Sequence, residues 1–191
     1  NFKKKKISGI FFIPGRPVLE KKVLHAHAIH EILINTKDKS AIVKKIDDYY
    51  LQNGLIDELK IFKKNNFCSD QFNDASTRYI KNMLQIFLPI NEREKIIYYF
   101  FQKNVTSDEL EYVEEFYLNE DDLKFMHLNN MVLFPHSINH YHLTTLSRKE
   151  FEIDIVNSLN FIRKFNKNLS DWIACYPYGT FNKKVKEICK K

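Results

Sequence analysis

The sequence lacks the features that define disulfide-rich and membrane-spanning proteins. Its 191 residues contain three cysteines, Cys68, Cys175 and Cys189, which is an odd number with no Cys-x-x-Cys pair. This usage predicts no disulfide framework and fits a reducing compartment. No apolar run approaches the ~20 residues that cross a bilayer, and no signal peptide is visible. We therefore expect no membrane span and favour a cytoplasmic location.

The sequence has only a modest excess of positive charge. Thirty Lys and Arg against 24 Asp and Glu give a formal net charge of +6, with lysine groups at residues 3–6 and 183–191. A nucleic-acid-binding protein more often shows a basic stripe interleaved with exposed aromatic residues. We interpret the lysines as solvated helix faces and predict no nucleic-acid partner. A basic helical module that binds an anionic surface is an alternative, and its binding would fall steeply with salt.

Three apolar segments indicate a globular domain that contains a sheet. Apolar residues make up 44% of the chain, which is long enough for one domain with a substantial core. Continuous apolar runs at residues 7–13, 131–134 and 172–176 are each closed by a proline. Runs without polar alternation are typical of strands covered on both faces, as in a parallel sheet.

A clearly marked helix follows the second apolar segment. Ser147 and Glu150 form a capping-box pattern, and apolar residues then recur at helical spacing from Phe151 to Ile162. Asp154 is expected on the polar side of this helix. Strand, helix and strand in this order predict a βαβ unit with a right-handed crossover. Asn182 is expected to cap a final helix.

Residues 18–118 have the pattern of successive helices. Periodicity and capping patterns predict helices at residues 23–34, 41–51, 55–62, 78–88, 92–101, 107–117 and 120–126. The aromatic run at residues 98–101 is interpreted as packing against the core. Aromatic residues dominate both cores and interfaces, so a sugar site or a partner site is an alternative for this run.

The run His-Ser-Ile-Asn-His at residues 136–140 is the strongest chemical signal. Two imidazoles four residues apart can face one point, and neutral imidazole is the commonest metal ligand in proteins. His142 is expected not to be a metal ligand, because two residues from His140 its side chain would point elsewhere. We interpret His25, His27 and His30 as contacts on a helix surface or with a subdomain, and a metal site at His27 and His30 is the alternative. Cys175 is interpreted as a buried strand cysteine, with a reactive thiol as the alternative. Asp171 is interpreted as a residue at the wrong end of its strand for catalysis.

Three segments together resemble one enzyme family. Gly-Ile-Phe-Phe-Ile-Pro-Gly at residues 9–15 is similar to its second strand, and residues 118–144 are similar to its helix, strand and His-Ser/Thr-x-x-His motif. Cys-Tyr-Pro-Tyr-Gly at residues 175–179 is similar to its third motif, which usually opens with Arg where this chain has Cys175. The family is the NodB-type polysaccharide deacetylases, carbohydrate esterase family 4.

The resemblance implies an α/β fold, a distorted (β/α) barrel of the deacetylase type. Residues 1–191 would form one deacetylase-like domain, with residues 18–118 as a helical insertion. The resemblance further implies a divalent metal held by an Asp and two His, with His136 and His140 as those two. Zinc is the expected metal, with cobalt, nickel or manganese as alternatives. The Asp pair that supplies the third ligand and the base is expected before Asn1, and the late catalytic His beyond Lys191.

The implied function is a metal-dependent hydrolase that acts on carbon–nitrogen bonds other than peptide bonds. It would remove N- or O-linked acetyl groups from a polysaccharide or glycan precursor. Tyr178 matches the backbone donor to the oxyanion, and Pro177 and Tyr178 match one wall of the substrate groove. The implied partner is an acetylated carbohydrate, and the helical insertion is a candidate docking face for a partner protein. A catalytically inactive carbohydrate-binding or scaffold protein on the same fold is the alternative.

Overall fold

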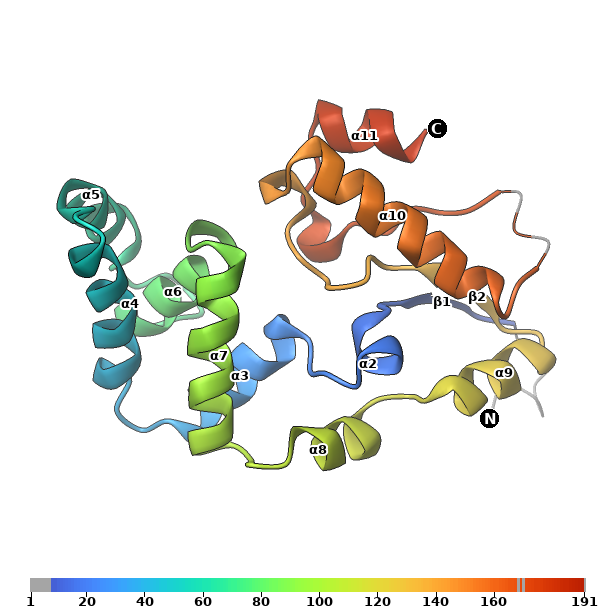
Figure 1. Cartoon of the computed structure of the whole chain (residues 1–191), viewed down its shortest axis with the longest axis horizontal. Helices are drawn as coiled ribbons and strands as arrows, with labels where there is room; N and C mark the ends of the chain where they lie inside the picture. Colours follow the sequence, from blue (N-terminus) through green and yellow to red (C-terminus); the bar gives the residue numbers. More distant parts are fainter. Residues whose placement is uncertain (1–7, 168, 170, 191) are drawn as a thin grey trace. The chain divides into compact units, whose positions relative to one another are not determined.

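The structure, a computed structural model, describes residues 8–167, 169 and 171–190, which divide into two compact units. The sheet unit comprises the described parts of residues 1–24 and 109–191, and the helical unit comprises His25–Asp108. Figure 1 follows both units by colour along the chain. Ile7 of the predicted first strand and the lysines at 3–6 and 191 lie outside the described residues.

A parallel pair of strands forms the sheet of the first unit. Strand β1 (Ile10–Ile13) pairs with β2 (Val132–Pro135), with Ile10 opposite Val132 and Ile13 opposite Pro135. The predicted parallel pairing is therefore confirmed for two of the three apolar segments. Backbone pairing continues beyond the strands, because Gly15 N donates to Ser137 O at 3.1 Å. The residues that follow β2 are thereby fixed beside the residues that follow β1.

The prediction of a third strand at residues 172–176 is wrong. This segment is irregular and leads into the short 3₁₀ helix η3 (Pro177–Gly179). Ile173 is 50% exposed, and Cys175 is also exposed, so the segment is not covered on both faces. An apolar run becomes a strand only where a neighbour accepts its backbone hydrogen bonds. The predicted βαβ unit is absent from the described residues, and the barrel and the size of the insertion stay predictions.

Helices pack on the sheet and form the core of the first unit. Helices α9 (Glu120–Leu128) and α10 (Arg148–Arg163) both contact β2 (Figure 1). The sheet unit also contains α2 (Arg16–Leu19), α8 (Glu109–Phe116), η2 (Leu143–Thr145) and α11 (Lys183–Cys189). Leu123, Leu133 and Ile162 are fully buried in one apolar cluster. Burial of such side chains supplies most of the driving force for folding.

Side-chain caps begin three helices of the sheet unit, and the caps at Ser147 and Asn182 were predicted. At α10 the Glu150 backbone N–H donates to Ser147 Oγ at 3.2 Å, and the Ser147 N–H donates to the Glu150 carboxylate at 2.7 Å. Asn119 forms the same kind of box with Asp122, and Asn182 accepts from the backbone N–H at the start of α11. These caps satisfy backbone donors that a helix start leaves without partners.

The helical unit consists of helices around a separate apolar core. They are α3 (His25–Asn35), α4 (Ser40–Gln52), α5 (Ile56–Asn66), α6 (Ala75–Asn82), the π-helix η1 (Met83–Phe87) and α7 (Ile90–Asn104). The helix predicted at residues 78–88 is thus divided into α6 and η1. The buried Arg93 guanidinium donates to the carbonyls of Gln85, Ile86 and Leu88, which stabilises this helix end. No helix in the described residues is long and apolar enough to cross a membrane.

The cap of α10 predicts a stability change. Ser147→Ala removes the acceptor for the Glu150 N–H and should lower the free energy of unfolding by about 1 kcal/mol. Urea denaturation followed by circular dichroism measures this loss. Ser69→Ala, at an exposed coil position, is the matched control. An equal loss in the two variants would contradict the capping role.

The same cap predicts a pH dependence. Hydrogen bonds from the Ser147 side chain and backbone hold the pKa of Glu150 below its ordinary value of 4.5. The stabilisation is therefore present above the pKa of the unfolded chain and is lost as the pH falls through the lower, folded value. The stability difference between wild type and Glu150→Gln should be constant near neutral pH and vanish in strong acid. A difference that persists unchanged into strong acid would exclude this linkage.

Candidate metal centre

Two histidine rings lie together at the carboxyl end of β2. His136 directly follows Pro135, the last residue of the strand, and its backbone N–H donates to Ile13 O at 3.1 Å. The ring centroids of His136 and His140 are 4.8 Å apart, with an interplanar angle of 69°. The expectation that this run brings two imidazoles to one place therefore agrees with the geometry. Carboxyl ends of parallel strands are where α/β folds commonly keep their chemistry.

The His136 ring is oriented by a backbone carbonyl. Its Nδ1 lies 2.9 Å from the carbonyl oxygen of Cys175, and a carbonyl can only accept a hydrogen bond. Nδ1 therefore carries the proton, and Nε2 presents a lone pair. Burial lowers the pKa of His136, which favours the neutral ring. This is the arrangement that metal-binding histidines use, with the second nitrogen fixed by an outer hydrogen bond.

The loop between the two histidines has an unusual backbone conformation. Ser137 and His140 have φ values of 66° and 57°, in the left-handed region that L residues seldom occupy. The Ser137 hydroxyl accepts from the His140 N–H at 3.1 Å and donates to Asp154 at 3.2 Å. The Ile138 N–H also donates to the Asp154 carboxylate, at 3.2 Å. These bonds compensate the cost of the strained conformation.

Asp154 is buried, so its predicted position on the polar side of α10 is wrong. It is 8% exposed, and the buried face of α10 consists of Phe151, Asp154, Ser158, Phe161 and Ile162. Asp154 lies three residues after Phe151 and therefore shares its face. Burial raises the pKa of Asp154, and the hydrogen bonds it accepts oppose that shift. The carboxylate thus accepts hydrogen bonds from residues 136–140, the histidine loop.

The rings of Tyr178 and His142 lie beside His140. The Tyr178 ring stacks on the His142 ring with centroids 3.9 Å apart and planes 4° apart, and it meets the His140 ring edge-on at 4.9 Å. His142 is buried, and its Nδ1 lies 3.2 Å from Thr180 Oγ1. His142 therefore lies beside the site through its stack on Tyr178, and the expectation that it is not a metal ligand stays a prediction. The stack of His142 on Tyr178 joins residues 36 positions apart, so no pattern of neighbouring residues in the sequence predicts it.

The motif at residues 175–179 is close to the histidines but differs in detail from the expectation. Cys175 is exposed and irregular rather than buried in a strand, and it contributes its carbonyl oxygen to His136. Pro177 is buried, while Tyr178 is 36% exposed and has a φ of 57°. The exposed residues Cys175, Tyr178 and Gly179 are thus the parts of this motif that a ligand can reach.

Among the described residues, no group of three or more His, Cys, Asp or Glu side chains could hold a metal ion, at the paired histidines or elsewhere. In the helical unit, His25 is buried with Nε2 3.6 Å from the Glu94 carboxylate. Burial and the nearby His30 lower the pKa of His27. His136 and His140 thus form a pair of imidazoles rather than a complete set of metal ligands. A neutral His136 ring whose Nδ1 is held by a carbonyl has the chemistry of a metal ligand.

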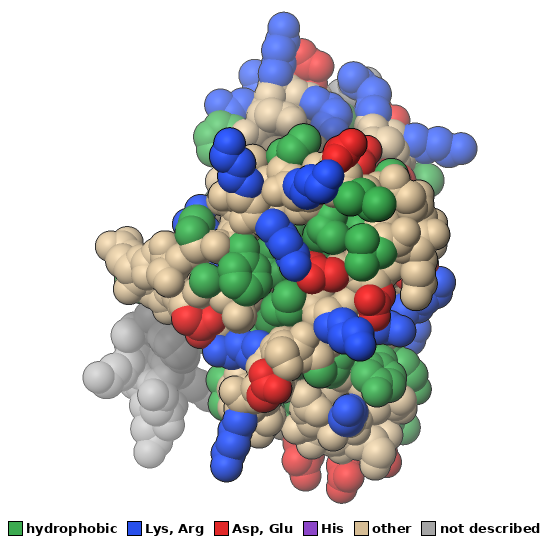
Figure 2. All heavy atoms as spheres, turned by 90° about the vertical axis from the view of Figure 1, so that its left-hand side faces the viewer, with side chains coloured by type: hydrophobic (Ala, Val, Ile, Leu, Met, Phe, Trp, Pro, Cys, Tyr) green, Lys and Arg blue, Asp and Glu red, His purple; other side chains and the backbone are tan. Residues whose placement is uncertain are grey.

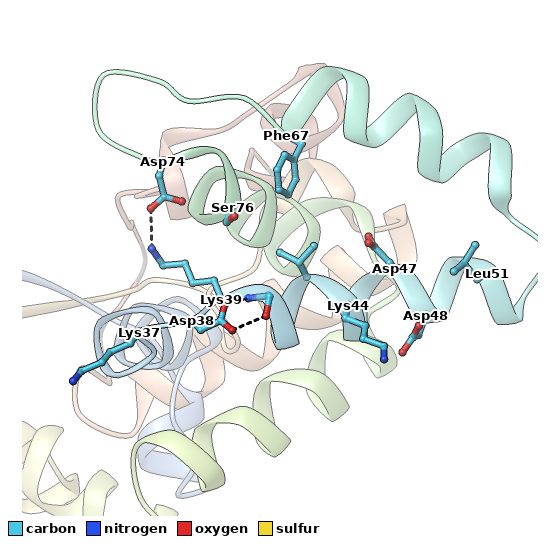
Figure 3. A pocket seen from close by; sticks show the side chains of 12 residues that line it. Lys37, Asp38, Lys39, Lys44, Asp47, Asp48, Leu51, Phe67, Asp74 and Ser76 are labelled. Atoms are coloured by element: carbon cyan, nitrogen blue, oxygen red, sulfur yellow. Dashed lines mark hydrogen bonds and ion pairs between the residues drawn. The ribbon is translucent and has the colours of Figure 1, made fainter.

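Two other surface features differ from this site. The face drawn in Figure 2 shows basic side chains dispersed among acidic and hydrophobic ones, without a continuous basic stripe. A cavity of about 690 Å³ lies in the helical unit, between α4 and residues 67–76. Figure 3 draws the side chains that line it. Lys39 and Asp74 form a 2.8 Å ion pair there, and no histidine lines the cavity. It offers no counterpart to the paired imidazoles.

Comparison with known proteins identifies the family. The family model of polysaccharide deacetylases matches residues 35–191, more than half of the chain. The chain belongs to the polysaccharide deacetylase family. This membership supports a hydrolase that acts on carbon–nitrogen bonds and fits a carbohydrate substrate. No curated protein and no solved structure matches this chain.

The match includes the candidate site. His136, His140 and residues 175–179 all lie inside the matched range. Residues 9–15 precede it, so their likeness to the family's second strand stays a prediction. Family membership and local geometry therefore coincide at the histidine loop.

Removal of the buried Asp154 carboxylate should lower the stability of the protein. Asp154→Ala leaves the Ile138 N–H and the Ser137 hydroxyl without their acceptor, which should cost about 2 kcal/mol of unfolding free energy. Urea denaturation of the protein tests this value. Glu152→Ala, two residues away on the exposed side of α10, should cost less than about 0.5 kcal/mol. Equal losses would show that Asp154 does not support the loop.

Proposed function

We propose that this deacetylase uses a divalent metal to remove N- or O-linked acetyl groups from a polysaccharide or glycan precursor. The observation that carries the proposal is the His136 ring, fixed through Nδ1 by the Cys175 carbonyl and 4.8 Å from the His140 ring. Zinc suits two imidazole donors best, and cobalt, nickel and manganese are alternatives. The third ligand and the base are not assigned among the described residues.

Each residue of the site has a distinct task in this proposal. His136 and His140 hold the metal, which when bound polarises the acetyl carbonyl and activates water. The left-handed backbone at Tyr178 is assigned the N–H that binds the oxyanion, a contact typically worth ~3–4 kcal/mol of barrier. The exposed face of the Tyr178 ring is assigned to the sugar, with Pro177 beneath as a buried support.

Metal occupancy tests the two histidines directly. The protein should bind about one divalent ion per chain, measured by elemental analysis after dialysis against zinc. His136→Ala and His140→Ala should each remove most of the bound metal, because each deletes one imidazole ligand. His127→Ala is the matched control, since His127 is exposed on α9 of the same unit. Unchanged occupancy in both site variants would overturn the metal assignment.

Acetate release tests the reaction itself. Wild-type protein should release acetate from an acetylated glycan in proportion to its bound metal, and the His127→Ala variant should do the same. The His136→Ala and His140→Ala variants should release at least a hundredfold less, because the carbonyl is no longer polarised. Metal binding without any acetate release would instead support the inactive carbohydrate-binding alternative.

A further inference from the structure

A second cavity of about 480 Å³ lies in the helical unit, between α4 and α7. Tyr49 and Gln52 line it from α4, Asn53 from the end of that helix, and Ile96 and Tyr99 from α7. Its volume falls within the range of roughly 300–1,000 Å³ that is typical of sites for small ligands. The paired histidines have no part in this cavity, because all of its lining residues belong to the helical unit.

The two tyrosine rings of the cavity are held by other aromatic rings. Tyr49 packs edge-on against buried Tyr50, with centroids 5.2 Å apart, and Tyr99 packs edge-on against buried Phe100 at 5.0 Å. Tyr99 nevertheless leaves 51% of its surface exposed. Lys103 Nζ lies over the Tyr99 ring, 5.8 Å from its centroid, so a ligand would share this ring with a cation. Aromatic rings held by their neighbours offer apolar faces and polar edges at a low cost in side-chain entropy.

The polar lining of the cavity combines amides with balanced charges. Gln52 and Asn53 contribute amide groups, and the Asn53 amide is oriented by donating to Tyr49 O at 2.7 Å. The charged lining consists of two lysines and two carboxylates, Lys45, Lys95, Asp48 and Glu92. Lys95 and Glu92 form an ion pair at 2.7 Å. A lining without net charge favours a neutral ligand rich in hydroxyl and amide groups over an anion or a cation.

The neighbouring cavity on α4 has a different character. Asp48 lines both cavities, and in Figure 3 its side chain points away from Phe67. The cavity of Figure 3 is lined by four Asp and three Lys residues, and its aromatic lining is the single ring of Phe67. The cavity between α4 and α7 differs from the cavity of Figure 3 because two tyrosine rings and two amide side chains line it.

We propose that the cavity between α4 and α7 binds a short, neutral, N-acetylated segment of a glycan. Apolar faces of sugar rings would lie on Tyr49 and Tyr99, while hydroxyl and acetamido groups would bond to the amides of Gln52 and Asn53. The choice of an acetylated glycan rests on the proposed function. A second binding site on the same chain raises the effective concentration of a polymeric substrate at the first site.

Binding of defined sugar tetramers tests the proposal. The probes are a tetramer of β-1,4-linked N-acetylglucosamine and the same tetramer without acetyl groups, titrated by isothermal calorimetry into His136→Ala protein, which does not convert them. Tyr99→Ala in this background should weaken binding of the acetylated probe about tenfold, equivalent to about 1.4 kcal/mol. Tyr99→Phe should retain binding because it keeps the ring. The deacetylated, cationic probe should bind more weakly than the acetylated one.

Tyr98 supplies a matched control for this experiment. It is the adjacent residue, is 53% exposed and does not line the cavity, so Tyr98→Ala should bind the acetylated probe as the background protein does. Equal losses in Tyr98→Ala and Tyr99→Ala, or no loss in either, would overturn the proposal. If wild-type protein binds the acetylated probe and the His136→Ala protein does not, the proposal for the cavity is overturned. The same result would support the metal-centred function. Binding that persists in metal-free protein would support the cavity even if acetate release failed.

Discussion

The buried carboxylate of Asp154 is the interaction on which the histidine loop depends. Burying a charge is costly unless donors surround it, and here the loop supplies them through Ser137 and Ile138. The same bonds hold Ser137 in its left-handed conformation, and its hydroxyl in turn accepts from the N–H of His140. One residue of α10 thus determines where two imidazoles after β2 can lie.

Contacts distant in sequence complete the site from the other side. The Cys175 carbonyl fixes the proton on His136 Nδ1, and Tyr178 lies between the rings of His142 and His140. The strand, the loop and η3 therefore constrain one another within the sheet unit. Membership of the polysaccharide deacetylase family supports a hydrolase that acts on carbon–nitrogen bonds. The geometry of the site supports the role that is proposed for each residue.

Local signals in the sequence predicted much of this structure, while contacts between distant segments were not predicted. Ser147 and Asn182 cap their helices as expected, because a cap depends only on residues within one turn. The strand expected at residues 172–176 is absent, since a strand needs a partner that the apolar run itself does not specify. The burial of Asp154 and the stack of His142 on Tyr178 also escaped prediction, because both depend on packing between segments.

The most direct test of the central claim is the position of the metal in a crystal of the zinc-loaded protein. An anomalous difference map at the zinc edge should show one peak about 2.0–2.1 Å from His136 Nε2 and from a ring nitrogen of His140. The His136 Nδ1 should remain bonded to the Cys175 carbonyl. A zinc peak at other residues, with no density between these two rings, would contradict the account.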